Sequence, residues 1–264
     1  MLGRDLFYDR RLSRSMTLSC QSCHDLSTNG ASSVAADRSD AGRRLAYNTP
    51  TVFNTAYSFR LGWEGKTRSL RDFAMGTLGT DHLMGGNGLA ARRLAADPRM
   101  TSRFRAVYGG VPSEDRIADA LSVFMATLVT PDAPFDRWLR GDRTALTKQQ
   151  VRGYDRFQQL GCASCHQGIN VGANIFQRRG IFHPLGDPNP RYLRVPSLRN
   201  VATTAPYFHD GSVGTLPDAI RRMARAQLDL TIGDRDLADV TAFLGSLTGT
   251  YQGHTVRAAP DWKK

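Results

Sequence analysis

The four cysteines of this 264-residue chain all belong to two copies of one short motif. The motif is Cys-x-x-Cys-His, and it occupies residues 20–24 and 162–166. Two thiols one turn apart can each add to a vinyl group of haem, and the histidine beside them can then bind the iron. A redox dithiol, a zinc site and two disulfides are the alternatives, but none of them needs a histidine at the same offset twice. The pattern therefore predicts two covalently attached c-type haems, which would be held by Cys20, Cys23, His24, Cys162, Cys165 and His166.

Composition places the chain among globular proteins, with 41% hydrophobic and 22% charged residues. Its longest nearly apolar stretch, residues 121–129, is far shorter than the ~20 residues that cross a membrane, so no membrane span is expected. The formal net charge is +11, from basic residues spread along the chain, and this predicts a partner with an acidic surface. Nucleic acid is the alternative partner for such a charge, but no nucleic-acid-binding motif accompanies it.

The haem motifs also bear on the compartment. Bacteria attach c-type haem outside the cytoplasm, so the chain is predicted to be periplasmic. The first eight residues, Met-Leu-Gly-Arg-Asp-Leu-Phe-Tyr, are too polar for the apolar segment of a signal peptide. We therefore expect that the targeting segment is not part of this sequence.

The two motifs are 142 positions apart, which suggests two haem domains of similar size, residues 1–140 and 141–264, joined near residues 135–142. Helical signals dominate. Ser113 reads as an N-cap before an apolar stripe that runs from Ile117 to Leu128, and Thr147 begins a capping box. A second stripe runs from Leu237 and is expected to end at Gly249. Residues 25–47 and 168–195 read as long loops. The predicted architecture is all-α, with two cytochrome c-like domains packed around an interface between them.

Further motifs lie outside the cysteine pairs. They are Leu-Gly and Leu-Phe before Asp-Arg-Arg-Leu-Ser at residues 9–13, Asn-Thr-Pro-Thr-Val-Phe-Asn at 48–54, Trp-Glu-Gly at 63–65, Val-Pro-Ser-Leu-Arg-Asn at 195–200, Ala-Pro-Tyr-Phe-His-Asp-Gly at 205–211, and the region of Met223. With these motifs the sequence resembles the bacterial dihaem cytochrome c peroxidase and MauG superfamily. The likeness runs through nearly the whole chain and is weakest over residues 85–150.

The resemblance implies a role for each haem. The haem of His24 would be the peroxidatic one, and the haem of His166 would transfer electrons with Met223 as its sixth ligand. A thioether ligand favours ferrous iron and suits an electron relay. Trp63 would lie between the haems and carry electrons or holes. Core packing is the alternative for both Met223 and Trp63.

The resemblance also implies a calcium site between the domains. Asn48, Thr204 and Pro206 match the positions that supply one side-chain oxygen and two backbone oxygens, which suit a hard cation. His209 matches a histidine near the second haem, and a hydrogen-bonded structural role is its alternative.

Two positions depart from the family pattern. Many relatives block the peroxidatic iron with a histidine in the loop after the first motif, but here no histidine lies between His24 and His82. Where the family places a distal glutamate, this chain has Leu83, which cannot move a proton. His82 and Asp81 precede it, so we expect one of them, His82 first, to act as the distal acid–base group. A surface loop position is the alternative for His82.

The missing block resembles the MauG and MbnH branch of the superfamily. The resemblance then implies an enzyme that activates hydrogen peroxide at the N-terminal haem to a high-valent state and oxidises a protein partner through the C-terminal haem and Trp63. MauG itself has a tyrosine in place of Met223 and a tryptophan in place of Leu160. An ungated peroxidase that draws electrons from a small cytochrome or cupredoxin is the alternative. A dihaem electron carrier is another, and it requires Met84 to bind the first iron.

Overall fold

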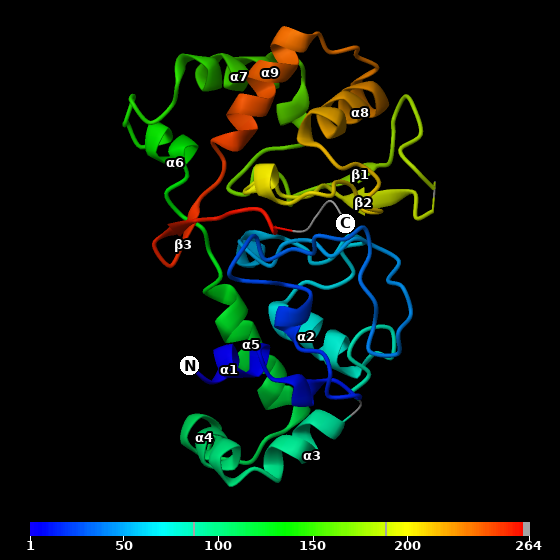
Figure 1. Ribbon diagram of the computed structural model, residues 1–264, viewed down its shortest axis with the longest axis vertical. Coiled ribbons are helices and arrows are strands. Elements are labelled where there is room, and N and C mark those ends of the chain that lie inside the picture. The colour runs from blue at the N-terminus through cyan, green and yellow to red at the C-terminus, as the bar shows by residue number, and fades with distance from the viewer. Residues whose placement is uncertain (87, 188, 261–264) are drawn as a thin grey trace.

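The computed structural model describes residues 1–86, 88–187 and 189–260. Figure 1 shows two helical halves stacked along the long axis, with the N-terminal half below and the C-terminal half above. The helices of the N-terminal half are α1 (Leu2–Phe7), α2 (Leu70–Gly79), α3 (Leu89–Ala95), α4 (Pro98–Tyr108) and α5 (Glu114–Ala126). Those of the C-terminal half are α6 (Pro134–Leu139), α7 (Lys148–Gln159), α8 (Leu216–Leu228) and α9 (Asp234–Gly245). None of the helices in the described part of the chain is long and apolar enough to cross a bilayer.

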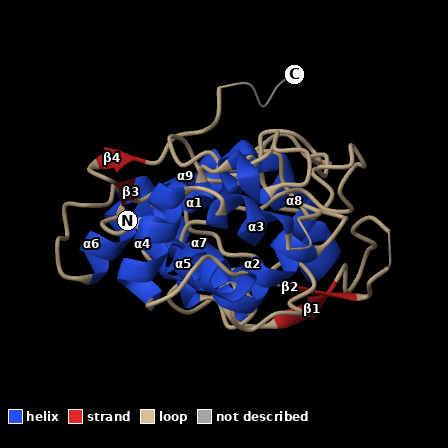
Figure 2. Cartoon of the chain, turned by 90° about the horizontal axis from the view of Figure 1, so that it is seen from below, coloured by secondary structure: helices blue, strands red, loops and turns tan. Residues whose placement is uncertain are grey.

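Strands are few and short. An antiparallel pair, β1 (Phe176–Arg178) and β2 (Tyr192–Arg194), places Gln177 opposite Leu193. A second pair, β3 (Thr250–Tyr251) and β4 (His254–Thr255), lies on the opposite side of the molecule in Figure 2. The β1–β2 pair falls inside the stretch expected to be a loop, residues 168–195. The all-α class is confirmed, and the hairpin is an addition to it.

The expected helix starts are present. The Ser113 side chain accepts a hydrogen bond from the Arg116 amide at the start of α5, and Thr147 and Gln150 form the capping box of α7. The expected end of the last helix is wrong, because α9 stops at Gly245 and Ser246 is its C-cap. Beyond it the Gly249 amide donates to Asn200 Oδ1 of the same half, and the Thr250 amide donates to the Pro131 carbonyl at 2.9 Å.

Each half is built on one close helix crossing. A Cβ atom at Gly3 in α1 would lie 1.9 Å from the Ala120 carbonyl oxygen of α5. A Cβ atom at Gly153 in α7 would lie 1.9 Å from the Asp239 carbonyl oxygen of α9. Only glycine lets these backbones approach so closely. The same close packing of two helices at a glycine therefore stabilises each half.

A second repeated feature joins the halves. Asn54 and Asn200 both have left-handed backbone conformations, with φ of 61° and 62°. Both side-chain amides donate to Thr130 Oγ1, at 2.7 Å and 3.0 Å. Thr130 lies between the two cores, so one hydroxyl ties both halves together.

The two hydrophobic cores do not follow the expected boundary at residue 140 in detail. The core of the N-terminal half runs to Leu128, and the other begins at Phe135 in α6. The chain also returns to its first half at the end, because Val256 is buried in the N-terminal core and Tyr251 packs on Phe53 with ring centroids 4.8 Å apart. Residues 251–256 therefore complete the N-terminal core.

Candidate functional site

Each Cys-x-x-Cys-His motif folds as one tight turn that ends on its histidine. The two turns are short 3₁₀ helices, Cys20–Ser22 and Cys162–Ser164. In each, the histidine amide donates to the carbonyl of the first cysteine at 3.0 Å, so that both thiols and the imidazole leave the same turn. All four thiols are unpaired. The motifs lie in different halves, and no cluster of three metal-binding side chains occurs among the described residues, which argues against a shared zinc site.

Burial makes these thiols poor redox nucleophiles. It raises the pKa of Cys20 and of Cys23 to about 12, and that of Cys162 to about 11. A redox dithiol needs a pKa below the ordinary value so that the thiolate forms at neutral pH. The thiols therefore suit covalent attachment of haem better than thiol exchange.

The two histidines fit the role of iron ligands. The Nδ1 atom of His24 lies 2.9 Å from the carbonyl oxygen of Gly30, which fixes the ring and leaves Nε2 for a metal. The pKa of His24 is lowered by burial, so the ring is neutral at pH 7. Burial also lowers the pKa of His166 to about 4. The Nδ1 atom of His166 is buried without a hydrogen-bond partner. A neutral imidazole is the form that binds a metal.

A pocket of about 120 Å³ opens beside His24. Cys20 and Cys23 line it together with side chains of α2 and α5, most of which are apolar. Leu83 and Met84 also line it, and His24 is the single imidazole among the described residues that do so. Its lining thus suits the apolar body of a haem.

The structure does not place His82 or Asp81 in this pocket. The Leu83 amide donates to the Thr80 carbonyl at 3.0 Å, which closes a turn with Asp81 and His82 at its exposed tip. Asp81 forms an ion pair with Arg14. Leu83 points into the pocket instead. The expected acid–base role of His82 is therefore not supported by its position, and the surface alternative is.

Replacing His82 by alanine should leave the reaction with hydrogen peroxide close to that of the wild type. Loss of a true distal acid–base group would slow it by about 10²- to 10⁴-fold. Stopped-flow absorbance at the Soret band measures this rate. A loss in that range would show that the turn at residues 80–83 folds inward when peroxide reacts.

Trp63 lies at the boundary between the halves. Its indole Nε1–H donates to the Asn48 carbonyl at 2.8 Å, and its ring meets the His209 ring edge-on with centroids 6.2 Å apart. The Arg194 amide of β2 donates to the Trp63 carbonyl at 2.9 Å. Trp63 thus belongs to the N-terminal half and contacts the C-terminal half. This placement agrees with the relay role, which stays a prediction.

The residues of the expected calcium site approach one another across the same boundary. Asn48 is buried, its backbone amide donates to the His209 carbonyl at 2.7 Å, and its side-chain amide donates to the Val34 carbonyl at 2.9 Å. Thr204 and Pro206 lie in the segment that leads to His209. The structure brings these segments together, and the calcium ion stays a prediction.

Met223 lies on the inward stripe of α8. Leu216 and Ile220, which precede it at helical spacing, pack on the C-terminal core beside Cys162. His209 is buried and is paired with Arg179. Arg179 is buried whereas its neighbour Arg178 is exposed, and two adjacent arginines carry no sequence signal that tells them apart.

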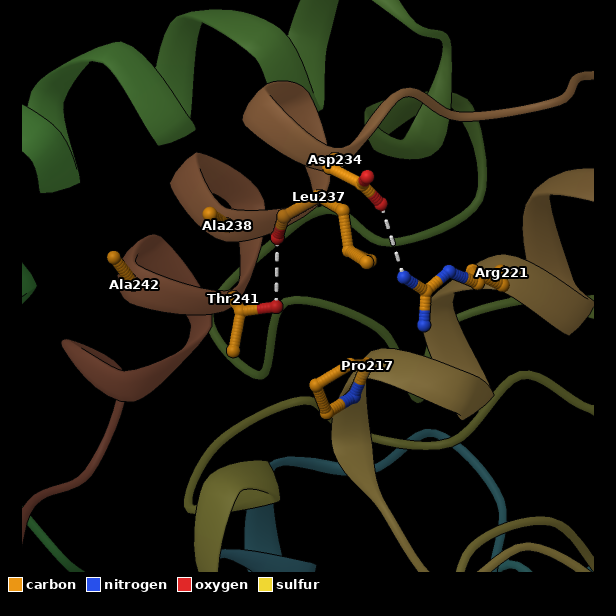
Figure 3. Close-up of a pocket in the computed structure, with 7 residues that line it drawn as sticks. All are labelled: Pro217, Arg221, Asp234, Leu237, Ala238, Thr241 and Ala242. Carbon is orange, nitrogen blue, oxygen red and sulfur yellow. Dashed lines mark hydrogen bonds and ion pairs between the residues drawn. The ribbon is translucent and has the colours of Figure 1, made fainter.

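A second depression lies between α8 and α9 and is drawn in Figure 3. Arg221 and Asp234 close one side through an ion pair of 3.2 Å, and Thr241 Oγ donates to the Leu237 carbonyl at 2.7 Å. No haem-attaching residue lines it. Its polar groups are satisfied by each other, so it is no candidate for the cofactor site.

The comparisons with known proteins agree with this site. The family model described as "Di-haem cytochrome c peroxidase" matches residues 1–144. The cytochrome c551 peroxidase of Nitrosomonas europaea is 36% identical to this chain over 94% of it and 79% of the relative. The chain belongs to the dihaem cytochrome c peroxidase and MauG superfamily. It is a peroxidase-type oxidoreductase that uses hydrogen peroxide and carries two c-type haems.

Members of both branches are similar to the chain. The methylamine utilization protein MauG of Methylorubrum extorquens is 31% identical over 93% of the chain and 77% of the relative. The crystal structure of a MauG-like protein associated with microbial copper homeostasis superposes with a TM-score of 0.83 at 26% identity, over 94% of this chain and 88% of that one. Both branches of the superfamily therefore contain proteins similar to this chain.

Proposed function

We propose that this chain is a periplasmic enzyme of the MauG-like kind, which uses hydrogen peroxide to oxidise a partner protein without first being reduced. The observation that carries the proposal is the pocket beside His24. Among the described residues that line it there is no second imidazole, and residues 25–47, the loop after the motif, contain no histidine. A blocking histidine ligand therefore has no candidate in that loop.

The haem supplies the iron at which the O–O bond of peroxide is cleaved. The protein holds it through Cys20 and Cys23 and orients the His24 ring through the Gly30 carbonyl. The apolar lining excludes water, while Arg38 and Ser39 bring hydrogen-bond donors to the pocket. These donors can orient a peroxide molecule in place of the absent distal glutamate.

Oxidising equivalents would then leave toward the C-terminal half through Trp63. Its indole ring contacts His209, and its carbonyl is bonded to β2 of that half. The net charge of +11 supports a partner with an acidic surface, because opposite charge steers the encounter of two proteins.

An ungated cytochrome c peroxidase is the second candidate. It is favoured by the higher identity to the peroxidase of Nitrosomonas europaea, 36%, than to MauG of Methylorubrum extorquens, 31%. This function requires rapid turnover of peroxide with a reduced small cytochrome or cupredoxin. The MauG-like function requires the oxidation of protein side chains instead.

A dihaem electron carrier is the candidate of another class. Met84 is buried and lines the pocket, where its thioether could bind the first iron as sixth ligand and so block the binding of peroxide. The oxidised carrier would show two low-spin haems by electron paramagnetic resonance. The enzyme should show one high-spin and one low-spin haem.

The fully oxidised protein should react with hydrogen peroxide without any reductant. Stopped-flow mixing should change the Soret band of the diferric protein at a rate proportional to peroxide concentration. Met84→Leu is the matched control, because it keeps the pocket apolar and removes the thioether. If only the Met84→Leu variant reacts, or if the wild type reacts only after one electron is added, the ungated proposal is wrong.

A further inference from the structure

Arg179 is a buried cation with an unpaired donor. Its side chain is only 9% exposed, and its Nε atom has no hydrogen-bond partner. One terminal nitrogen is bonded to His209 Nε2, and the other donates to the Asn189 carbonyl at 3.1 Å. Because an arginine can only donate, His209 accepts through Nε2. None of these partners is negatively charged.

Burial of an uncompensated charge is costly, so an arginine in such a place is normally paired with an anion. The ion pairs among the described residues do not include Arg179, although Asp187 and Asp210 act on His209 through space. Arg194, the other buried arginine, differs in this respect. Its Nε donates to the Gly62 carbonyl at 2.9 Å and so is satisfied by the protein. Of these two buried arginines, only Arg179 has a buried side-chain nitrogen without a hydrogen-bond partner.

The position of Arg179 relates it to the second haem site. It directly follows β1, and its amide donates to the Arg191 carbonyl at 3.1 Å, which continues the hairpin. In the same strand, Gln177 Nε2 donates to Sγ of the haem-attaching Cys165 at 3.8 Å. The hairpin therefore borders the turn that carries the C-terminal haem.

The repeat between the halves gives an independent indication. A Cβ atom at Gly65 would meet Phe176 of the C-terminal half, and one at Gly211 would meet Ala35 of the N-terminal half. Arg179 lies three residues beyond Phe176, and Arg38 lies three residues beyond Ala35. Arg38 lines the pocket beside His24, the haem site of its own half. The similar placement of Arg179 points to the haem site of its own half.

We propose that the free Nε–H of Arg179 donates to a propionate of the C-terminal haem, and that Arg179 thereby sets the reduction potential of that haem. A guanidinium suits a carboxylate because its donors are fixed in one plane. The remaining donors hold His209, whose ring contacts Trp63. Arg179 is thus a positioning residue. The inference requires the two haems of the superfamily but not the oxidation of a partner protein.

Arg179→Gln should lower the potential of the C-terminal haem, because loss of a positive charge beside the propionate favours ferric iron. We expect at least a tenfold change in the ferric–ferrous equilibrium, which corresponds to about 59 mV for one electron. Spectroelectrochemical titration of the holoprotein measures both haems. Arg178→Gln is the matched control, since it removes the same charge from the exposed neighbouring residue. Equal potentials in the two variants, or a shift confined to the N-terminal haem, would overturn the proposal.

A second variant guards against a loss of folding in Arg179→Gln. Arg179→Lys retains the charge but changes the hydrogen bond, so the propionate bending modes of the ferrous haem should shift in resonance Raman spectra. Arg178→Lys should leave them unchanged. Unaltered modes in Arg179→Lys, at full haem content, would show that no propionate is bonded to this side chain.

Discussion

Replacing Gly153 by alanine should strongly destabilise the C-terminal half. The new Cβ would lie 1.9 Å from the Asp239 carbonyl oxygen and 2.8 Å from Phe243 Cβ, so α7 and α9 would have to separate. Overpacking of this kind costs about 1–3 kcal/mol and sometimes more. For a chain of this size each kcal/mol lowers Tm by roughly 2–4 °C. Thermal unfolding followed by circular dichroism should therefore show a fall of several degrees.

Gly245→Ala is the matched control. Gly245 is the last residue of α9 in the same half, and a Cβ there would meet nothing within 4 Å. Alanine is favoured over glycine in a helix by roughly 0.5–1 kcal/mol, so Tm should stay the same or rise slightly. Equal melting of the two variants would mean that α7 and α9 do not cross as closely as described.

Replacing Met223 by histidine should lower the potential of the C-terminal haem by on the order of 100 mV, within the ~0.8 V range that axial ligands span. A nitrogen donor lacks the preference of a thioether for ferrous iron. The measurement is again a spectroelectrochemical titration of the holoprotein.

Met223→Leu separates a ligand from a packing residue. It keeps the apolar volume of Met223 on the inward stripe of α8 and removes the sulfur. If Met223 binds iron, this variant should lose the low-spin signal of the C-terminal haem. An unchanged potential in Met223→His and an unchanged spectrum in Met223→Leu would place the sixth ligand elsewhere.

Local signals in the sequence were sufficient for most helices and for the haem turns. The N-caps Ser113 and Thr147 act within one turn of their own position, so no knowledge of the fold is needed to predict them. The same holds for the thiols and imidazole of each haem motif, which leave a single turn. The end of α9 was misjudged because Gly249 is used for tertiary packing against Thr130 and not as a helix cap.

Features that depend on contacts between distant segments cannot be predicted from such local signals. His82 and Leu83 are adjacent, and only the turn that begins at Thr80 decides which of them faces the pocket. Arg178 and Arg179 differ in exposure because β1 alternates its faces, and that strand exists only through its pairing with β2. The hairpin was missed since three-residue strands carry too little pattern to be seen.

The burial of Val256 in the N-terminal core has a consequence for biosynthesis. A chain is made from its first residue, so the turn that carries Cys20 and Cys23 exists long before residue 256 does. During that interval the first core lacks its final apolar side chain, and Phe53 lacks the ring of Tyr251. The N-terminal half is therefore incompletely packed until residues 251–256 have been synthesised.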